Sequence, residues 1–182
     1  MSLGRTGLGE LAAAIIRVVS SWFRTCGYAG VYRHLIVGAL PLDEADVRLL
    51  TAFGVDRVLN LVEDGEYKRG DRRKVERALA NAGIEEQRLP TEDYGSLSPE
   101  LLEHATAQVN AWLDDDLTVY LHCRAGWQRA ATVAAGVVAL RDGTDPETAL
   151  AQVQALKNTA DPLPHQRDDL QRWFEGRVSR QT

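Results

Sequence analysis

A cysteine and an arginine six positions apart are the residues of this sequence best suited to chemistry. Cys123 and Arg129 enclose a short segment that follows His122 and contains Gly126. A thiolate is a strong nucleophile, and an arginine guanidinium can hold two oxygens of a phosphate group at once. The combination therefore predicts attack of a sulfur atom on phosphorus. The opposing interpretation is a buried structural cysteine and an arginine in a surface ion pair.

The segments on either side of this motif are typical of a β-strand and an α-helix. Thr118–His122 is short and apolar, and Gln128–Arg141 is rich in alanine and valine. Backbone N–H groups in a loop between a strand and a helix N-terminus can turn inward and cradle an anion. Gly126 permits backbone angles that a side chain would hinder. The helix dipole and the guanidinium favour a thiolate at Cys123, and we expect His122 to orient the loop.

The loop is therefore expected to bind phosphate. The residues assigned to this role surround the nucleophile: His122, Arg124, Ala125, Gly126, Trp127 and Gln128.

The leaving alkoxide or phenolate also needs a proton, which a carboxylic acid can supply. Pro90–Gly95 leaves the strand that precedes the one feeding Cys123, and it contains Glu92 and Asp93. If the two strands are parallel, both loops open at the same edge of the sheet. Asp93 is the first choice as general acid and Glu92 the alternative, while a solvated turn is the competing interpretation.

Strand and helix patterns alternate after Gly30 and predict an α/β fold. Strands are expected at His34–Val37, Arg57–Val62, Ile84–Leu89 and Thr118–His122. Helices are expected at Leu42–Phe53, Asp71–Ala82, Pro99–Asp115, Gln128–Arg141, Pro146–Lys157 and Gln166–Glu175. This alternation implies a central, mostly parallel twisted sheet of about 4–5 strands flanked by helices. The loops 63–70, 90–97 and 123–129 should meet at the edge where such sheets bind ligands.

Composition excludes several functional classes. A formal charge of −5 and a pI of about 5.4 argue against a partner that is nucleic acid. Two cysteines, Cys26 and Cys123, are too few for a disulfide framework and lack the spacing of zinc ligands. We therefore expect a cytoplasmic protein without a metal site.

The N-terminal residues 1–30 are expected to form an extension to a domain at 31–178. The apolar residues of Leu8–Phe23 fall on one face of a helix that is too short to span a membrane. Two interpretations stay open: a helix packed on the domain, or an interfacial helix touching a membrane through residues 8–24, with Trp22 and Phe23 at the surface.

Together these motifs resemble the cysteine-dependent protein tyrosine phosphatase superfamily, in its dual-specificity branch. The family motif, His-Cys followed after five residues by Arg, matches His122–Arg129, and the aspartate of its mobile loop matches Asp93. Within the branch, the chain is similar to the phosphatidylglycerophosphate phosphatase-like group. The further similar segments are Val37–Pro41, Gly54–Leu61, Cys123–Gly126 and a late helix with Gln166, Leu170 and Trp173. The resemblance runs from Tyr32 to Glu175.

The resemblance implies hydrolysis of a phosphomonoester in two steps. Cys123 attacks phosphorus while Asp93 protonates the leaving group, and water then hydrolyses the phosphocysteine with Asp93 as base. Arg129 holds the phosphate oxygens, and no metal or cofactor is implied. The implied substrates are phosphotyrosine, phosphoserine or phosphothreonine in proteins, or an anionic phospholipid monoester. Ala130 stands where the family usually has serine or threonine, which predicts a slow second step.

The sequence leaves two questions open: which substrate the protein binds, and whether it is an enzyme or a binding module. Basic residues near the site favour a multiply anionic headgroup: Arg124, Lys68, Arg69, Arg72 and Arg73. Alternatively, Arg69, Arg72 and Arg73 pair with Glu66, Asp71 and Glu76 on a solvated helix. Ala130 and Trp127 also fit a non-catalytic phosphate-binding module, a pseudophosphatase. A rhodanese-like sulfurtransferase is the weaker rival, because its cysteine loop needs neither the arginine nor the acid loop.

Overall fold

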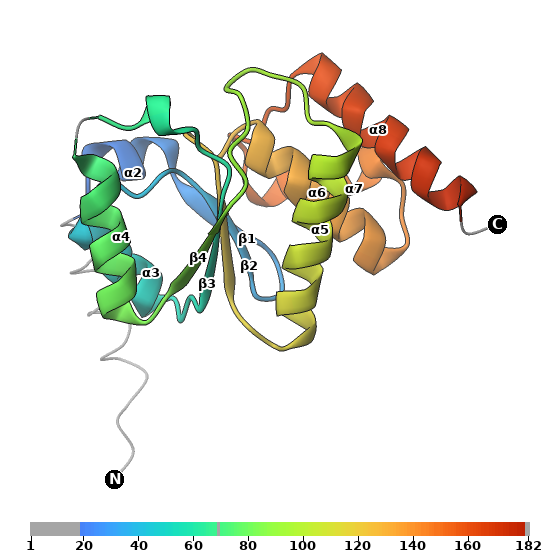
Figure 1. The fold of residues 1–182 in the computed structure, drawn as a ribbon. Helices are drawn as coiled ribbons and strands as arrows, with labels where there is room; N and C mark the ends of the chain where they lie inside the picture. Colours follow the sequence, from blue (N-terminus) through green and yellow to red (C-terminus); the bar gives the residue numbers. More distant parts are fainter. Residues whose placement is uncertain (1–18, 69, 181–182) are drawn as a thin grey trace, which may run out of the picture.

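A five-stranded sheet with helices on both faces forms the core of the computed structural model, which describes residues 19–68 and 70–180 (Figure 1). The strands are β1 (Tyr28–Tyr32), β2 (Leu35–Gly38), β3 (Arg57–Asn60), β4 (Glu85–Arg88) and β5 (Val119–His122). Their order is β1-β2-β5-β3-β4, with β1 antiparallel to β2 and the other neighbours parallel. The predicted α/β class and mostly parallel sheet are confirmed.

The described helices form two layers. Three of them, α2 (Ser21–Cys26), α3 (Glu44–Ala52) and α4 (Asp71–Ala82), cover one face of the sheet (Figure 1). The other layer consists of α5 (Pro99–Asp114), α6 (Arg129–Asp142), α7 (Pro146–Leu156) and α8 (Pro164–Ser179). A short 3₁₀ helix, η1 (Asp64–Glu66), follows β3.

Alternate residues of the central strands point into the two layers, as the pleat of a strand requires. Val58 and Tyr120 pack in the core under α3 and α4, whereas Leu59 and Leu121 pack in the core under α5 and α6. All four residues of β5 are buried because the strand has a neighbour on each side and a helix layer on each face. The sequence that leads to Cys123 is therefore rigidly held.

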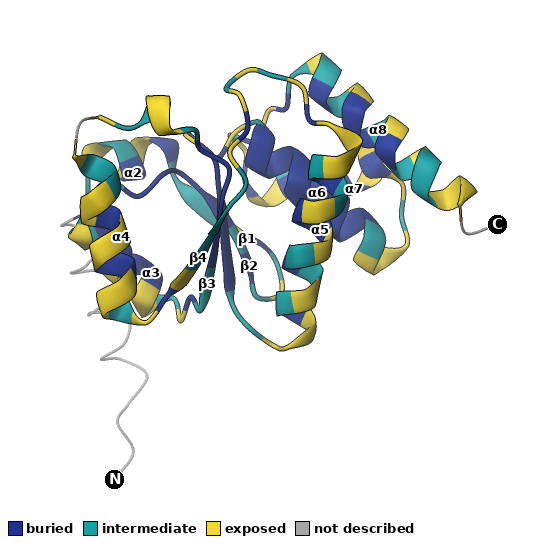
Figure 2. Cartoon of the chain, in the orientation of Figure 1, coloured by how far each residue is buried: buried dark blue, intermediate teal, exposed yellow. Residues whose placement is uncertain are grey.

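Helix α6 is buried along most of its length, as its dark colour in Figure 2 shows. Eleven of its fourteen residues are buried, and most of them are small. At Gly136 an added Cβ would lie 2.9 Å from the Thr106 methyl group and 3.2 Å from the Trp173 ring. The absence of a side chain there lets α5 and α8 approach α6 closely, which fixes the start of α6 in place.

The sequence predictions identify most elements and miss one strand. The predicted range of α4 agrees with the structure, and the ends of most other elements differ by a few residues. The sequence analysis does not predict strand β1, because Tyr28–Tyr32 contains a glycine and overlaps the end of the predicted extension. The boundary placed between residues 30 and 31 falls inside this strand, so residues 28–30 belong to the same sheet as the rest.

Only the end of the predicted N-terminal helix lies within the described residues, since residues 8–18 fall outside them. There α2 begins at Ser21, and the Ser20 side chain caps it by accepting from the Phe23 N–H. Phe23 is fully buried and its ring lies against those of Tyr28 and Tyr120. The interfacial interpretation is therefore wrong for Phe23, which packs on the domain. None of the described helices is long and apolar enough to cross a membrane.

Candidate active site

The loop from Cys123 to Gln128 connects β5 to α6 at the carboxyl edge of the sheet. Gly126 has a φ of 73°, and a Cβ on it would lie 2.4 Å from the Gly38 carbonyl oxygen. Only glycine fits here, because the loop turns directly against the end of β2. The Leu40 N–H donates to the Arg124 carbonyl at 2.9 Å and joins the loop to the same region.

His122 makes the hydrogen bond expected of it. Its Nδ1 lies 3.1 Å from the carbonyl oxygen of Cys123. Since a carbonyl only accepts, Nδ1 carries the proton. Complete burial lowers the pKa of His122 to about 4, and the positive charges of Arg72 and Arg129 act in the same direction. The hydrogen bond to the Cys123 carbonyl raises the pKa but does not outweigh them. The imidazole is therefore neutral at physiological pH and shapes the loop from behind.

Arg129 is buried under the loop and oriented from several sides. Its Nη1 and Nη2 donate to the two carboxylate oxygens of Glu66, both at 2.8 Å. Nη1 also donates to the Thr91 carbonyl at 2.6 Å, and Nη2 to Asp93 at 2.8 Å. Burial opposes its charge, but the bond to Glu66 and the negative charges nearby raise the pKa of Arg129 above its usual value. The guanidinium is thus permanently charged.

One donor of Arg129 is unused. Its Nε is buried and has no hydrogen-bond partner. A buried donor without a partner carries a desolvation penalty of roughly 1–3 kcal/mol, so its presence calls for a ligand acceptor. The side chain is only 1% exposed, which rules out the surface ion pair of the opposing interpretation.

Glu66 is the partner of Arg129 that the sequence analysis missed. It was paired with the arginines of α4, whereas Arg72 actually binds Glu76 and Glu86. Burial raises the pKa of Glu66, but the hydrogen bonds and charge of Arg129 outweigh this and lower it overall. The sequence contains a signal for this contact: the loop 63–70 is expected at the same edge of the sheet as Arg129, and a buried arginine requires a carboxylate partner.

Asp93 lies in the loop after β4, where the sequence placed it. Its Oδ1 accepts from Arg129, and its side chain is 30% exposed. Glu92, the alternative acid, is exposed and lies outside the hydrogen bonds of Arg129. Helix α8 fastens the far end of this loop, since Gln166 donates to the Gly95 carbonyl and Asp169 accepts from the Leu97 N–H.

A cavity of about 490 Å³ brings these groups together. The predicted site residues that line it are Asp93, Cys123, Arg124, Ala125, Trp127, Gln128 and Arg129. His122 and Gly126 lie outside its lining. The lining residues that the sequence analysis did not assign to the site are Trp22, Thr25, Cys26 and Tyr94. The predicted nucleophile, a buried cation and the predicted acid therefore share one opening, an arrangement that phosphoryl transfer requires.

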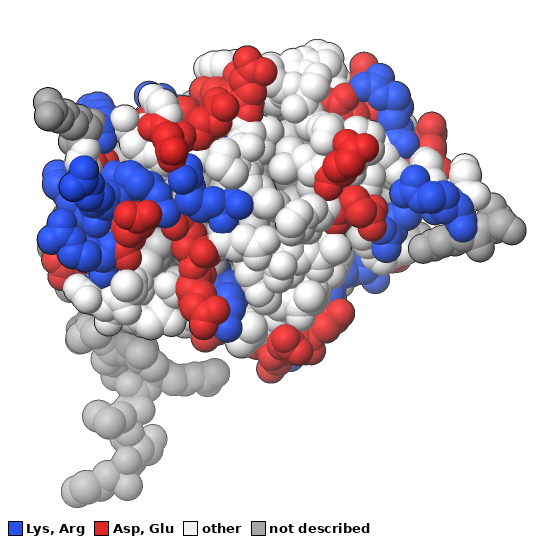
Figure 3. All heavy atoms as spheres, viewed as in Figure 1, with Lys and Arg blue, Asp and Glu red and all other residues white. Residues whose placement is uncertain are grey.

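A smaller cavity of about 140 Å³ adjoins the first, because Trp22 and Arg124 line both. The Arg124 guanidinium lies over the Trp22 ring, 5.8 Å from its centre. Lys68 lines this second cavity, and basic side chains gather over nearby α4 (Figure 3). The surroundings of the site can therefore receive further negative charge.

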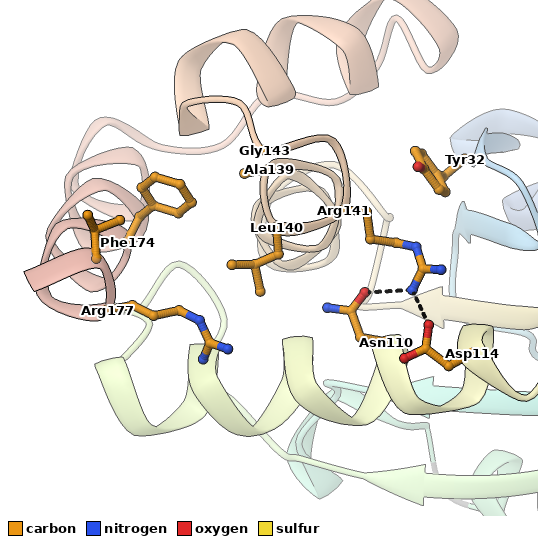
Figure 4. Close-up of a pocket in the computed structure, with 10 residues that line it drawn as sticks. Tyr32, Asn110, Asp114, Ala139, Leu140, Arg141, Gly143, Phe174 and Arg177 are labelled. Atoms are coloured by element: carbon orange, nitrogen blue, oxygen red, sulfur yellow. Dashed lines mark hydrogen bonds and ion pairs between the residues drawn. The ribbon is translucent and has the colours of Figure 1, made fainter. Parts of the chain in front are cut away.

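A further cavity, of about 620 Å³, lies at the opposite end of α6 (Figure 4). Arg141 crosses it to reach Asn110 and Asp114. Its lining contains no cysteine, serine or histidine. Within the described ranges 19–68 and 70–180, no cluster of three histidine, cysteine or acidic residues could hold a metal ion.

Comparisons with known proteins agree with this geometry. A family model, described as "Swiss Army Knife protein, DSP-PTPase phosphatase domain", matches residues 31–173. A curated relative, phosphatidylglycerophosphatase and protein-tyrosine phosphatase 1 of Rattus norvegicus, is 26% identical over 149 residues, or 81% of this chain and 76% of the relative. The Mus musculus protein of the same name is also 26% identical over the same shares of both chains.

Two solved structures share the fold. The crystal structure of PTPMT1 in complex with PI(5)P has a TM-score of 0.73 at 23% identity and covers 85% of this chain and 99% of that one. A kinase-associated phosphatase carrying a serine in place of its catalytic cysteine has a TM-score of 0.72 at 19% identity, covering 84% and 94%.

Proposed function

Because this chain belongs to the DSP-PTPase phosphatase domain family, in the dual-specificity branch of the cysteine-dependent protein tyrosine phosphatase superfamily, we propose that it hydrolyses phosphomonoesters through a phosphocysteine. The observation that carries the proposal is Arg129. Its guanidinium is buried and oriented by Glu66 and Asp93, its Nε has no partner, and the residue lines the same cavity as Cys123.

The first step transfers the phosphoryl group to sulfur. The thiolate of Cys123 attacks phosphorus, and the bond from phosphorus to the leaving oxygen breaks as Asp93 gives that oxygen its proton. Phosphate binding at Arg129 displaces Asp93 from Nη2 and frees its carboxyl group to turn towards the leaving oxygen. Arg129 and the loop amides hold the equatorial oxygens, where negative charge is spread in the transition state.

The second step regenerates the free enzyme. Water attacks phosphorus, the sulfur–phosphorus bond breaks, and Asp93 takes the proton from the water. Cys123 leaves as a thiolate without help from a hydroxyl group, since Ala130 occupies the following position and is fully buried. The second step is therefore the slow one.

For the substrate, we propose an anionic phospholipid monoester in preference to a phosphoprotein. Two cations, Arg124 and Lys68, line the second cavity together with Glu66, which is bound to Arg129, and Asp71, which is paired with Lys74. Arg124 and Lys68 can therefore bind a further negative group, and the Trp22 ring adds an apolar wall. The complex of PTPMT1 with PI(5)P supports this choice, and the curated relatives are named for both activities, phosphatidylglycerophosphatase and protein-tyrosine phosphatase. Membrane contact through residues 8–24 and a cytoplasmic location stay predictions.

The test compares the wild type with Cys123→Ser on p-nitrophenyl phosphate, phosphotyrosine peptide, phosphoserine peptide and vesicles containing PI(5)P or phosphatidylglycerophosphate. The matched control is Cys26→Ser, which changes the other cysteine of the same cavity. We expect Cys123→Ser to lose about 10⁴-fold or more in kcat, and Cys26→Ser to keep most activity. Equal background rates in wild type and Cys123→Ser would instead favour the non-catalytic phosphate-binding module.

The same panel tests the substrate class. A kcat/KM on lipid vesicles well above that on either peptide supports the phospholipid assignment. The ratio should fall in Arg124→Gln, whereas hydrolysis of p-nitrophenyl phosphate should change little, since that substrate has a single phosphate. A higher rate on phosphotyrosine peptide than on both lipids would overturn the lipid assignment and leave a protein phosphatase.

A further inference from the structure

A buried lysine beside the loop that contains Cys123 has no acidic partner among the described residues. Lys157 follows α7 and is 4% exposed. Its Nζ donates to the Cys26 carbonyl at 3.1 Å and to the Thr159 hydroxyl at 2.7 Å. An ammonium has three N–H donors, so one is left over. Across residues 19–68 and 70–180, Lys157 forms no ion pair with a carboxylate.

Such a lysine needs an explanation, because lysines are almost never fully buried unless they are paired. Burial lowers the pKa of Lys157, as expected for a cation removed from water, while Cys123 and Cys26, in that order, raise it. These thiols are the ionisable groups whose charge acts on Lys157 in the described structure. A thiolate is therefore the anion that can compensate its charge.

Of the two thiols, Cys123 is the one suited to carry the charge. Burial, as the largest effect, raises the pKa of Cys26, which keeps Cys26 protonated. Cys123 also acts on Arg129, whose pKa it raises. The other titratable group coupled to both thiols is Tyr120, whose pKa burial raises well above its usual value, so that it is neutral. Cys123 therefore has two cations around it, Arg129 and Lys157.

Hydrogen bonds hold Lys157 against the loop. The Cys26 carbonyl accepts hydrogen bonds both from Lys157 Nζ and from the Trp127 indole N–H, the latter at 3.4 Å. Four residues after Lys157, the Asp161 N–H donates to the Trp127 carbonyl at 2.7 Å. The segment after α7 is thus joined to the loop that contains Cys123, and Lys157 cannot easily turn to solvent.

We propose that Lys157 is a positioning residue that acts through Cys123, as a second buried cation that holds the thiolate ready for attack. This inference rests on the proposed function for its catalytic meaning, although the charge interaction exists with or without turnover. Arg129 binds the phosphate, and its charge is shared with Glu66 and Asp93. Lys157 has no such carboxylate, so its charge is available to the sulfur atom.

The test measures alkylation of Cys123 by iodoacetamide as a function of pH, with the modified peptide quantified by mass spectrometry. The full-length variants are Lys157→Met, which removes the charge, Lys157→Arg, which keeps it, and Thr159→Val, which removes a hydrogen-bond partner only. We expect the midpoint of the profile to rise by about one pH unit in Lys157→Met, that is, about tenfold less thiolate below the midpoint. Lys157→Arg and Thr159→Val should stay close to the wild type.

Two outcomes would overturn the proposal: a profile of Lys157→Met that superimposes on the wild type, or an equal shift in Thr159→Val, which would mark a purely structural role. A reciprocal measurement does not depend on the folding of Lys157→Met. In Cys123→Ser, ¹⁵N NMR of Nζ should show a pKa of Lys157 below that in the wild type, because the thiolate is gone; an unchanged value would also refute the proposal. Alkylation needs no turnover, so failure here leaves the hydrolysis test of the proposed function intact.

Discussion

The buried imidazole of His122 should make the protein lose stability in mild acid. Its side chain is 1% exposed, and its pKa of about 4 lies below the usual value of 6.5. Between these two values the unfolded chain binds a proton that the folded chain does not, so stability falls as pH decreases through this window. Below about pH 4 both states are protonated, and this group adds no further dependence.

The two pKa values give the size of the effect. Relative to pH 7, the linkage relation predicts a loss of about 2 kcal/mol at pH 5 and about 3 kcal/mol at pH 4 from His122 alone. Glu66 and Glu103 have lowered pKa values and act at lower pH. Their contribution to stability is present above about pH 4.5 and is lost as the pH falls below that value. The interval from pH 6.5 to 5 therefore isolates the histidine.

The assay is urea unfolding followed by circular dichroism at half-unit steps between pH 7 and 4. The matched variant is His122→Asn, whose side-chain amide can still donate to the Cys123 carbonyl but does not titrate. The wild type should lose about 2 kcal/mol more than His122→Asn between pH 7 and 5. The other three histidines remain in both proteins and cancel in the difference. Parallel curves for the two proteins would refute the assignment of a neutral, buried imidazole.

The remaining predictions concern the loop and its supports. Ala130→Ser should abolish a burst of p-nitrophenol that the wild type shows in rapid-quench experiments, because the added hydroxyl helps the thiolate leave; no burst in the wild type would contradict a slow second step. Glu66→Gln should lower stability to urea by about 3 kcal/mol and kcat/KM by about tenfold or more, since it leaves Arg129 short of a buried counter-charge; unchanged values would show that Asp93 alone suffices. Gly126→Ala should lower kcat about 100-fold, because its Cβ meets the Gly38 carbonyl. Gly143→Ala has the same positive φ but open space around it, and should leave kcat unchanged.

Much of the fold was predictable because its signals are local. The proline and the capping residues Ser98 and Asp145 mark the starts of α5 and α7, and both side chains make the expected capping bonds. The strands that lead to the site are short and alternate with helices, and their parallel arrangement follows from that alternation. Strand β1 was missed because its residues are only partly buried and pair at the edge of the sheet.

For the candidate site, sequence reasoning reaches only residues that are close in the chain or that follow from the order of the strands. Cys123, Arg129 and the loop between them are contiguous, and Asp93 follows from the parallel sheet. Two contacts at the site join residues far apart in the sequence. Glu66 binds Arg129, 63 residues away, and Lys157 binds the Cys26 carbonyl, 131 residues away. No spacing rule links such residues, since their proximity depends on how η1 and the end of α7 pack against the loop.

The attachment of the acid loop at both ends limits how that loop can move. Thr91 is held through its N–H by Leu61 and through its carbonyl by Arg129. Gly95 is held by Gln166 of α8. The span between these attachments is residues 92–94, a turn rather than a lid, in which the Glu92 carbonyl accepts from the Gly95 N–H and His165 lies 3.1 Å from the Tyr94 carbonyl. In the proposed mechanism, Asp93 would therefore reach a leaving group by rotation of its side chain, and the entrance of the site would keep its shape.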